Sequence, residues 1–131
     1  MNREKQLGQT VVLLAEDEPM VRNMIRVTLT ASGYQVLDVP DGRQAIELSR
    51  QYQGDIDLLL TDLKMPHVDG AKAAEIISTE RPGIRVLIIS GHASDEIRKE
   101  AITQAFLRKP FAPSQLREKI REVLEQPPAM R

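Results

Sequence analysis

Four short apolar runs of this 131-residue chain end in polar side chains that can do chemistry. These groups are carboxylates, one hydroxyl and one ammonium: Glu16, Asp17, Asp62, Ser90 and Lys109. Clustered carboxylates repel one another unless a cation lies between them, and Mg²⁺ accepts carboxylate oxygens together with a phosphate oxygen. With Mg²⁺ present, Asp62 can attack phosphorus as a nucleophile and form an aspartyl phosphate. Lys109 and Ser90 would then bind the transferred oxygens.

The apolar runs that position these groups are too short for typical helices. They predict five strands, at Val11–Ala15, Gln35–Val39, Ile56–Thr61, Arg85–Ser90 and Ala105–Arg108. Four of the five carry apolar residues on consecutive positions, as strands covered on both faces do. The sequence therefore predicts a parallel sheet.

Helical spacing occupies the segments between these strands. The predicted helices are Pro19–Ala31, a helix capped by Asp41 with Gln44 three residues on, Val68–Thr79, Ser94–Thr103, and a last helix opened by Pro113. Right-handed crossovers fold this alternation into a doubly wound five-stranded parallel α/β sheet, (βα)5, with strand order 2-1-3-4-5. In such a sheet the site forms at the carboxyl ends of the strands, so the polar groups converge with Asp62 at the centre.

Composition excludes several classes of function. Eighteen Lys and Arg against nineteen Asp and Glu leave a net charge of −1, with no basic excess for direct nucleic-acid binding. Zero cysteines exclude disulfides and thiolate metal sites and fit a reducing compartment, so a cytoplasmic protein is expected. No apolar run is long enough to span a membrane. One domain over residues 10–125 is predicted, with flexible ends at 1–9 and 126–131.

Each polar group taken alone also has a structural explanation. Asp62 can cap a turn, Ser90 can be a turn residue and Lys109 can be a surface charge. Their conjunction at successive strand ends favours a site. The Lys109-Pro110 pair is a stronger sign, because a fixed or cis bond there would hold the lysine in place.

The motifs occur in a fixed order along the chain: Glu16-Asp17, then Asp62-Leu63-Lys64-Met65-Pro66 with Asp69-Gly70, then Ser90-Gly91, then Lys109-Pro110-Phe111. In this order they resemble the receiver domain of two-component response regulators, from about Thr10 to Leu124. The resemblance implies a flavodoxin-like fold and a bacterial phosphorelay protein. It also implies that Asp62 is the phosphoacceptor, supplied by a sensor histidine kinase or phosphotransfer protein.

The resemblance further implies a ligand set for Mg²⁺. Asp17 and Asp62 would bind the ion directly, Lys64 through its backbone carbonyl, and Glu16 through a water molecule. Ser90 and Lys109 would hold the phosphoryl group. The family usually has a cis peptide bond at the position of Lys109-Pro110.

Switching residues are implied in the same way. Phe106 falls at the switch aromatic, together with Ser90, although a core aromatic is the alternative. Lys64 and His92 fall where side chains tune dephosphorylation, and exposed loop residues are the alternative. The face built from Ser94–Thr103, Ala105–Arg108 and the last helix would rearrange to control an unknown output protein or domain. Dimerisation through this face on phosphorylation is a further expectation.

Three alternatives are weighed against this hypothesis. A metal-dependent phosphohydrolase would carry a second acid where Lys64 stands, so the chain is expected to catalyse only its own phosphorylation and dephosphorylation. A flavodoxin-like electron carrier would need a Ser/Thr-rich phosphate loop and an aromatic stack for flavin. A phosphorylation-independent docking module would lack an acid or the lysine, and all are present. Whether the chain acts alone or within a hybrid kinase or longer regulator stays open.

Overall fold

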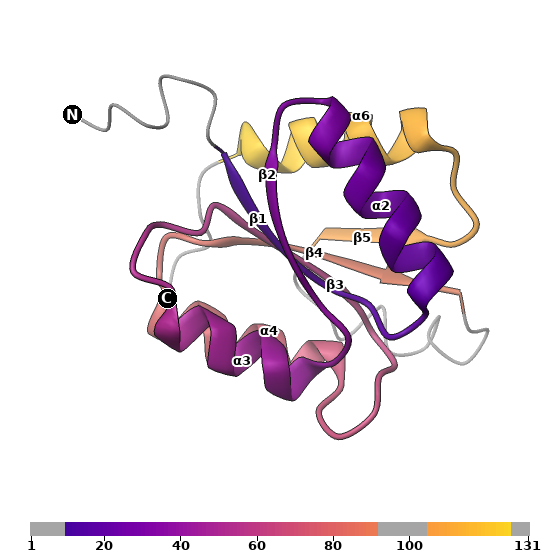
Figure 1. Cartoon of the computed structure of the whole chain (residues 1–131). Helices are drawn as coiled ribbons and strands as arrows, with labels where there is room; N and C mark the ends of the chain where they lie inside the picture. Colours follow the sequence, from indigo (N-terminus) through magenta and orange to yellow (C-terminus); the bar gives the residue numbers. More distant parts are fainter. Residues whose placement is uncertain (1–9, 92–104, 127–131) are drawn as a thin grey trace.

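The computed structural model describes residues 10–91 and 105–126. The strands are β1 Val11–Ala15, β2 Gln35–Val39, β3 Leu58–Asp62, β4 Arg85–Ser90 and β5 Ala105–Arg108. They form one five-stranded sheet of order β2-β1-β3-β4-β5, and every pairing is parallel (Figure 1). The predicted fold class and strand order are confirmed. His92 and the predicted helix Ser94–Thr103 lie outside the described residues.

Two helical layers cover the sheet. The described helices are α2 Pro19–Ala31, α3 Gly42–Gln51, α4 Gly70–Glu80 and α6 Pro113–Leu124. In Figure 1, α3 and α4 lie on one face and α2 and α6 on the other. The buried apolar side chains form two clusters accordingly, one on each face of the sheet. Within the described part of the chain, no helix is both long and apolar enough to cross a membrane.

The strands differ in burial according to their place in the sheet. Every residue of β1 and β3 is buried, and β4 is buried apart from its first residue. The edge strands β2 and β5 are partly exposed. Consecutive apolar residues therefore mark the central strands, which helices cover on both faces. The acidic groups lie at the carboxyl ends of the two fully buried strands, β1 and β3.

The start of α4 corrects the predicted helix boundary. The helix begins at Gly70 rather than Val68, because the side chain of Asp69 accepts a hydrogen bond from the N–H of Lys72 at 2.9 Å and caps it. It ends at Glu80 rather than Thr79.

The predicted bounds of β3 were also wrong by one or two residues. The strand begins at Leu58 rather than Ile56 and includes Asp62. Just before it, the carboxylate of Asp57 accepts a hydrogen bond from the N–H of Val11 at 2.8 Å. The phosphoacceptor candidate Asp62 is thus part of the strand itself, and its backbone is held by the sheet.

At two other helix starts, those of α3 and α6, the local signals predict the structure. The side chain of Asp41 caps α3 by accepting from the N–H of Gln44 at 2.8 Å. Pro113 opens α6, and the N–H of Ala112 donates to Oε1 of Gln115 at 2.7 Å. Both signals lie within one helical turn, which is why the sequence alone reveals them.

At the amino edge of the sheet, Arg81 joins α4 to the end of α3. Its guanidinium donates to the carbonyls of Ser49, Tyr52 and Gly54 at 2.7, 2.8 and 2.9 Å, and to the Ser49 hydroxyl at 2.9 Å. Carbonyls at a helix end have no partner within the helix, so Arg81 satisfies acceptors that α3 leaves open. The two helices are fixed to each other at this edge.

Candidate functional site

Three carboxylates meet at the carboxyl edge of the sheet. Glu16 and Asp17 follow β1 and Asp62 ends β3, and each offers one oxygen within 4.8 Å of the others. Glu16 is fully buried and Asp62 is 5% exposed, whereas Asp17 is exposed. The predicted acidic residues are thus brought together, with one of them open to solvent. A set of hard oxygen ligands without sulfur or imidazole suits Mg²⁺ better than zinc.

Lys109 lies against two of these acids. Its Nζ is 3.0 Å from Oε1 of Glu16 and 3.3 Å from Oδ2 of Asp62, and its side chain is 20% exposed. The N–H of Lys109 donates to the carbonyl of Ser90 at 2.8 Å, which ties the residue after β5 to the end of β4. Ser90 is 2% exposed. The peptide bond between Lys109 and Pro110 is cis.

The pKa values of Glu16, Asp62 and Lys109 depart from their ordinary values. Burial raises the pKa of Glu16 to about 7, and the negative charge of Asp62 adds to this rise. Burial also raises the pKa of Asp62, against the opposing effect of Lys109. For Lys109, burial alone lowers the pKa, but the charges of Asp62 and Glu16 outweigh it and raise the pKa above its ordinary value. The lysine stays charged and compensates the acids.

The backbone holds Asp62 closely. The N–H of Leu63 donates to Oδ1 of Asp62 at 2.9 Å, and the hydroxyl of Thr61 donates to its carbonyl at 2.9 Å. A Cβ atom on Gly70 would lie 2.0 Å from the carbonyl oxygen of Asp62, so only glycine fits at this position. Gly70 was part of the recognised motif, but its close approach to Asp62 comes from the tertiary structure.

The loop from β3 to α4 contains a strained residue. His67 has a φ of 72°, and the N–H of Val68 donates to the carbonyl of Pro66 at 2.9 Å, so the three residues form a γ-turn. Lys64, earlier in this loop, has an exposed side chain. Phe106 on β5 is half-buried and packs against the cluster on the α3 and α4 face. Its surroundings are those of a core aromatic, and its switching role stays a prediction. The predicted roles of Lys64 and His92 in tuning dephosphorylation also stay predictions.

One polar contact of the site was not foreseen. Arg22, in the first turn of α2, donates to the carbonyl of Glu16 at 2.8 Å. The sequence shows it only as a residue away from the apolar stripe of that helix. A basic side chain one turn after an acidic strand end is the signal that could have indicated it.

The sequence profile of the response regulator receiver domain matches residues 12–121 of the chain. The chain belongs to this family. The receiver match covers the five strands apart from Val11, together with most of α6, and it includes every acidic and basic residue of the site described above.

Relatives of this receiver include several signalling proteins. The sensor kinase CckA of Brucella abortus (strain 2308) is 33% identical over 121 residues, which are 90% of this chain and 13% of the kinase. A response regulator receiver protein from Sinorhizobium medicae WSM419 has a similar structure, with a TM-score of 0.80 and 31% identity, over 90% of this chain and 96% of that one.

The receiver domain of the sensor histidine kinase PA1611 from Pseudomonas aeruginosa PAO1 is 25% identical, with a TM-score of 0.78, over 90% of this chain and 99% of that one. That structure has a magnesium ion coordinated in its active site cleft. The chain spans only part of the length of these curated relatives, from 13% of CckA to 53% of a glycerol metabolism activator from Pseudomonas putida.

Proposed function

We propose that this receiver accepts a phosphoryl group on Asp62 from the phosphohistidine of a sensor histidine kinase or phosphotransfer protein. The observation that carries the proposal is the triad of carboxylates within 4.8 Å of one another, with the Lys109 ammonium against two of them. A cluster with two buried carboxylates is destabilising unless it binds a cation or a charged ligand. The magnesium ion in the similar receiver of PA1611 supports the same assignment here.

The donor set fits Mg²⁺. Asp17 and Asp62 are proposed as direct ligands, Lys64 as a ligand through its carbonyl, and Glu16 as a ligand through a bound water. When bound, Mg²⁺ neutralises the negative charge that would otherwise keep a phosphoryl group away from a carboxylate. The partial exposure of the cluster at Asp17 gives such an ion access from solvent.

The residues of the chain then have separate roles in the transfer. An oxygen of Asp62 forms a bond to phosphorus while the bond between phosphorus and the donor imidazole breaks, and the electron pair of that bond leaves with the imidazole. Leu63 holds Oδ1 of Asp62 through its N–H, which orients the carboxylate. Lys109 and Ser90 bind the phosphoryl oxygens, and the charge of Lys109 favours the ionised form of Asp62. The chain catalyses only its own phosphorylation and dephosphorylation.

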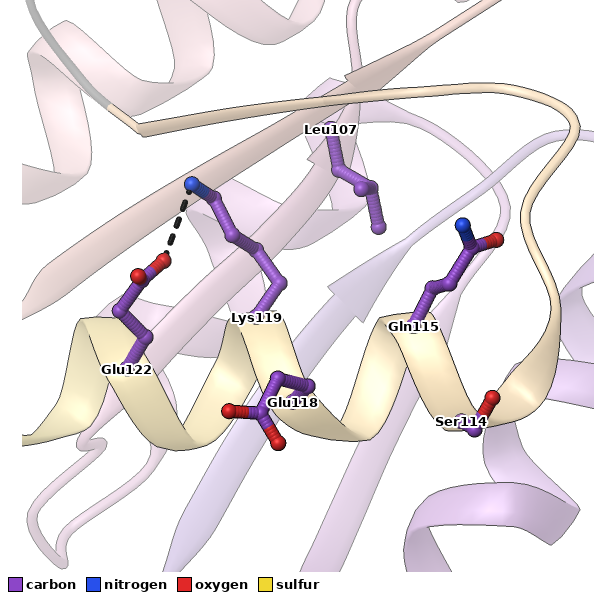
Figure 2. A pocket seen from close by; sticks show the side chains of 6 residues that line it. All are labelled: Leu107, Ser114, Gln115, Glu118, Lys119 and Glu122. Atoms are coloured by element: carbon purple, nitrogen blue, oxygen red, sulfur yellow. Dashed lines mark ion pairs between the residues drawn. The ribbon is translucent and has the colours of Figure 1, made fainter.

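The proposed output runs through the face that contains β5 and α6. The hydroxyl of Ser90 is expected to move toward the phosphoryl group and Phe106 to fill the space, which alters this face. A hollow of about 300 Å³ lies on its described part (Figure 2). Its floor is Leu107 of β5, and its rim is the polar side of α6, where Lys119 and Glu122 form an ion pair at 3.1 Å. A cytoplasmic partner protein or an output domain would bind this face and respond to its rearrangement. Dimerisation through the same face is one form of output.

The proposal is tested by the intact mass of the protein after incubation with Mg²⁺ and acetyl phosphate. We expect a gain of one phosphoryl group, lost in Asp62→Asn and in the presence of EDTA. Asp41→Asn is the matched control, because asparagine also caps a helix and the fold should be kept. If a folded chain with bound Mg²⁺ gains no phosphoryl group from acetyl phosphate or from a phosphorylated donor protein, the proposal is wrong and a phosphorylation-independent docking module is favoured.

A further inference from the structure

Arg22 bridges the end of β1 and the edge strand β2. Its Nη1 donates a hydrogen bond to the carbonyl of Glu16 at 2.8 Å. Its Nε lies 3.5 Å from Oδ2 of Asp38 on β2, and the two side chains are 22% and 31% exposed. One half-buried guanidinium in the first turn of α2 therefore joins three elements beside the acid cluster.

The carbonyl that Arg22 binds belongs to the peptide unit between Glu16 and Asp17. Because this unit is planar, fixing the direction of its carbonyl also fixes the direction in which the chain enters Asp17. The N–H of Glu16 donates to the carbonyl of Val39 on β2 at 3.1 Å. The backbone at Glu16 is thus held to β2 twice, once directly and once through Arg22 and Asp38.

We propose that Arg22 is a positioning residue for the acid cluster and that Asp38 is its anchor. The inference rests on the proposed function in one respect: Mg²⁺ is the ligand whose affinity depends on the positions of the three carboxylates. A guanidinium presents Nε and Nη1 in a rigid planar fork, whereas a lysine ammonium presents the same charge at one point. Arg22→Lys therefore keeps the charge and loses the simultaneous contact with Glu16 and Asp38.

The test is a calorimetric titration of Mg²⁺ alone into the wild-type chain and its variants. Loss of a group that orients a metal ligand lowers affinity by roughly 10- to 100-fold, so we expect Arg22→Lys to raise the Kd for Mg²⁺ about tenfold. Asp38→Asn should raise it less, and the double variant no more than Arg22→Lys alone, because both changes act through one contact. Arg26→Lys is the control on the same helix, where the guanidinium contacts Asn23, and it should leave the Kd unchanged.

A crystal structure of metal-free Arg22→Lys gives a second measurement. We expect the carboxylate of Asp17 to leave the arrangement in which three acidic oxygens lie within 4.8 Å of one another. An unchanged cluster with an unchanged Kd for Mg²⁺ would overturn the proposal, even where Tm falls, because Arg22 would then be structural only. If the wild-type chain binds no Mg²⁺, the metal part of the proposed function fails, and the carboxylate positions in Arg22→Lys still decide the role of Arg22.

Discussion

Two half-buried cationic side chains, Lys109 and Arg81, lie at the carboxyl and the amino ends of the strands, and they contact different kinds of groups. At the carboxyl edge, Lys109 lies between the carboxylates of Glu16 and Asp62, at 3.0 and 3.3 Å. At the amino edge, Arg81 donates to backbone carbonyls at the end of α3 and in the loop that follows. Carboxylates titrate in the ordinary pH range and carry a charge that attracts metal ions, whereas peptide carbonyls are neutral and do not titrate.

This difference separates the two edges by function. Arg81 forms its contacts when the chain folds. Because its carbonyl partners are neutral and do not titrate, these contacts persist in the folded protein. The contacts of Lys109 compete with any ion or phosphoryl group that reaches the acids. We therefore expect substitutions at the amino edge to change stability and substitutions at the carboxyl edge to change chemistry.

Lys109→Met should have the largest effect. Removing one cationic donor from a site where charge develops slows a reaction by roughly 10²- to 10³-fold, so phosphorylation of Asp62 by acetyl phosphate should slow by about this factor. The rate is measured by intact mass against time. Lys119→Met on α6, which removes an ion pair with Glu122 outside the site, is the control. Equal phosphorylation rates in Lys109→Met and Lys119→Met would show that the contacts of Lys109 with the acids do not contribute to the chemistry.

The stability of the metal-free protein should fall as the pH rises. Burial raises the pKa of Glu16 from 4.5 to about 7, so between these values the folded chain keeps a proton that the unfolded chain has released. The free energy of unfolding then decreases with pH, by on the order of 3 kcal/mol in all. The raised pKa of Lys109 acts only in the alkaline range and does not oppose this trend.

Urea denaturation in EDTA at several pH values measures this slope. Glu16→Gln should flatten it, because the amide does not titrate. Saturating Mg²⁺ should flatten it too, by favouring the ionised cluster. A stability that rises between about pH 4.5 and pH 7 in EDTA would contradict the assigned protonation of Glu16.

Arg81→Ala should lower the free energy of unfolding by about 2–3 kcal/mol, because it leaves several backbone acceptors without a donor. Arg85→Ala, whose guanidinium donates to the carbonyl of Gln126 at 2.8 Å, should cost less. Neither change should alter the Kd for Mg²⁺. A change of this Kd in Arg81→Ala would show that the two edges are coupled.

Gly70→Ala should lower the free energy of unfolding by about 3 kcal/mol, because the added methyl group pushes the Asp62 backbone out of place. The methyl group would meet the carbonyl of Asp62, whereas nothing lies within 4 Å of a Cβ at Gly83. Gly83→Ala is therefore the matched control. Gly70→Ala should also slow phosphorylation, and a rate equal to that of Gly83→Ala would show that Asp62 tolerates the displacement.

Features with local causes were predictable from the sequence. The bounds of β1, β2, β4 and β5, the Asp41 cap and the Pro113 start depend on residues within one turn or one strand. The family resemblance then predicts that Asp62 forms one site with Glu16 and Asp17, which are distant from it in sequence. The cap at Asp69 is equally local, but apolar spacing alone places the start of this helix at Val68, two residues before Gly70.

No local sequence signal predicts the contacts between segments that are distant in the chain. Arg81 reaches carbonyls 27 to 32 residues away in the chain, and an arginine before a proline and a glycine indicates only a helix end. The link from Arg22 to Asp38 likewise depends on how α2 packs beside β2. Hydrophobic periodicity shows which face of a helix is buried, but it does not show which polar groups a long side chain will meet.

The ion pair between Lys109 and Glu16 joins residues that are 93 positions apart. Contacts of such long range form only after much of the intervening chain has ordered, because loop closure costs entropy before the contact repays it. A nascent chain whose β1, β3 and β4 have emerged from the ribosome, but whose β5 has not, contains the acidic residues without the Lys109 ammonium group. Under the proposed function, the ability to accept a phosphoryl group is therefore acquired only when β5 joins the sheet.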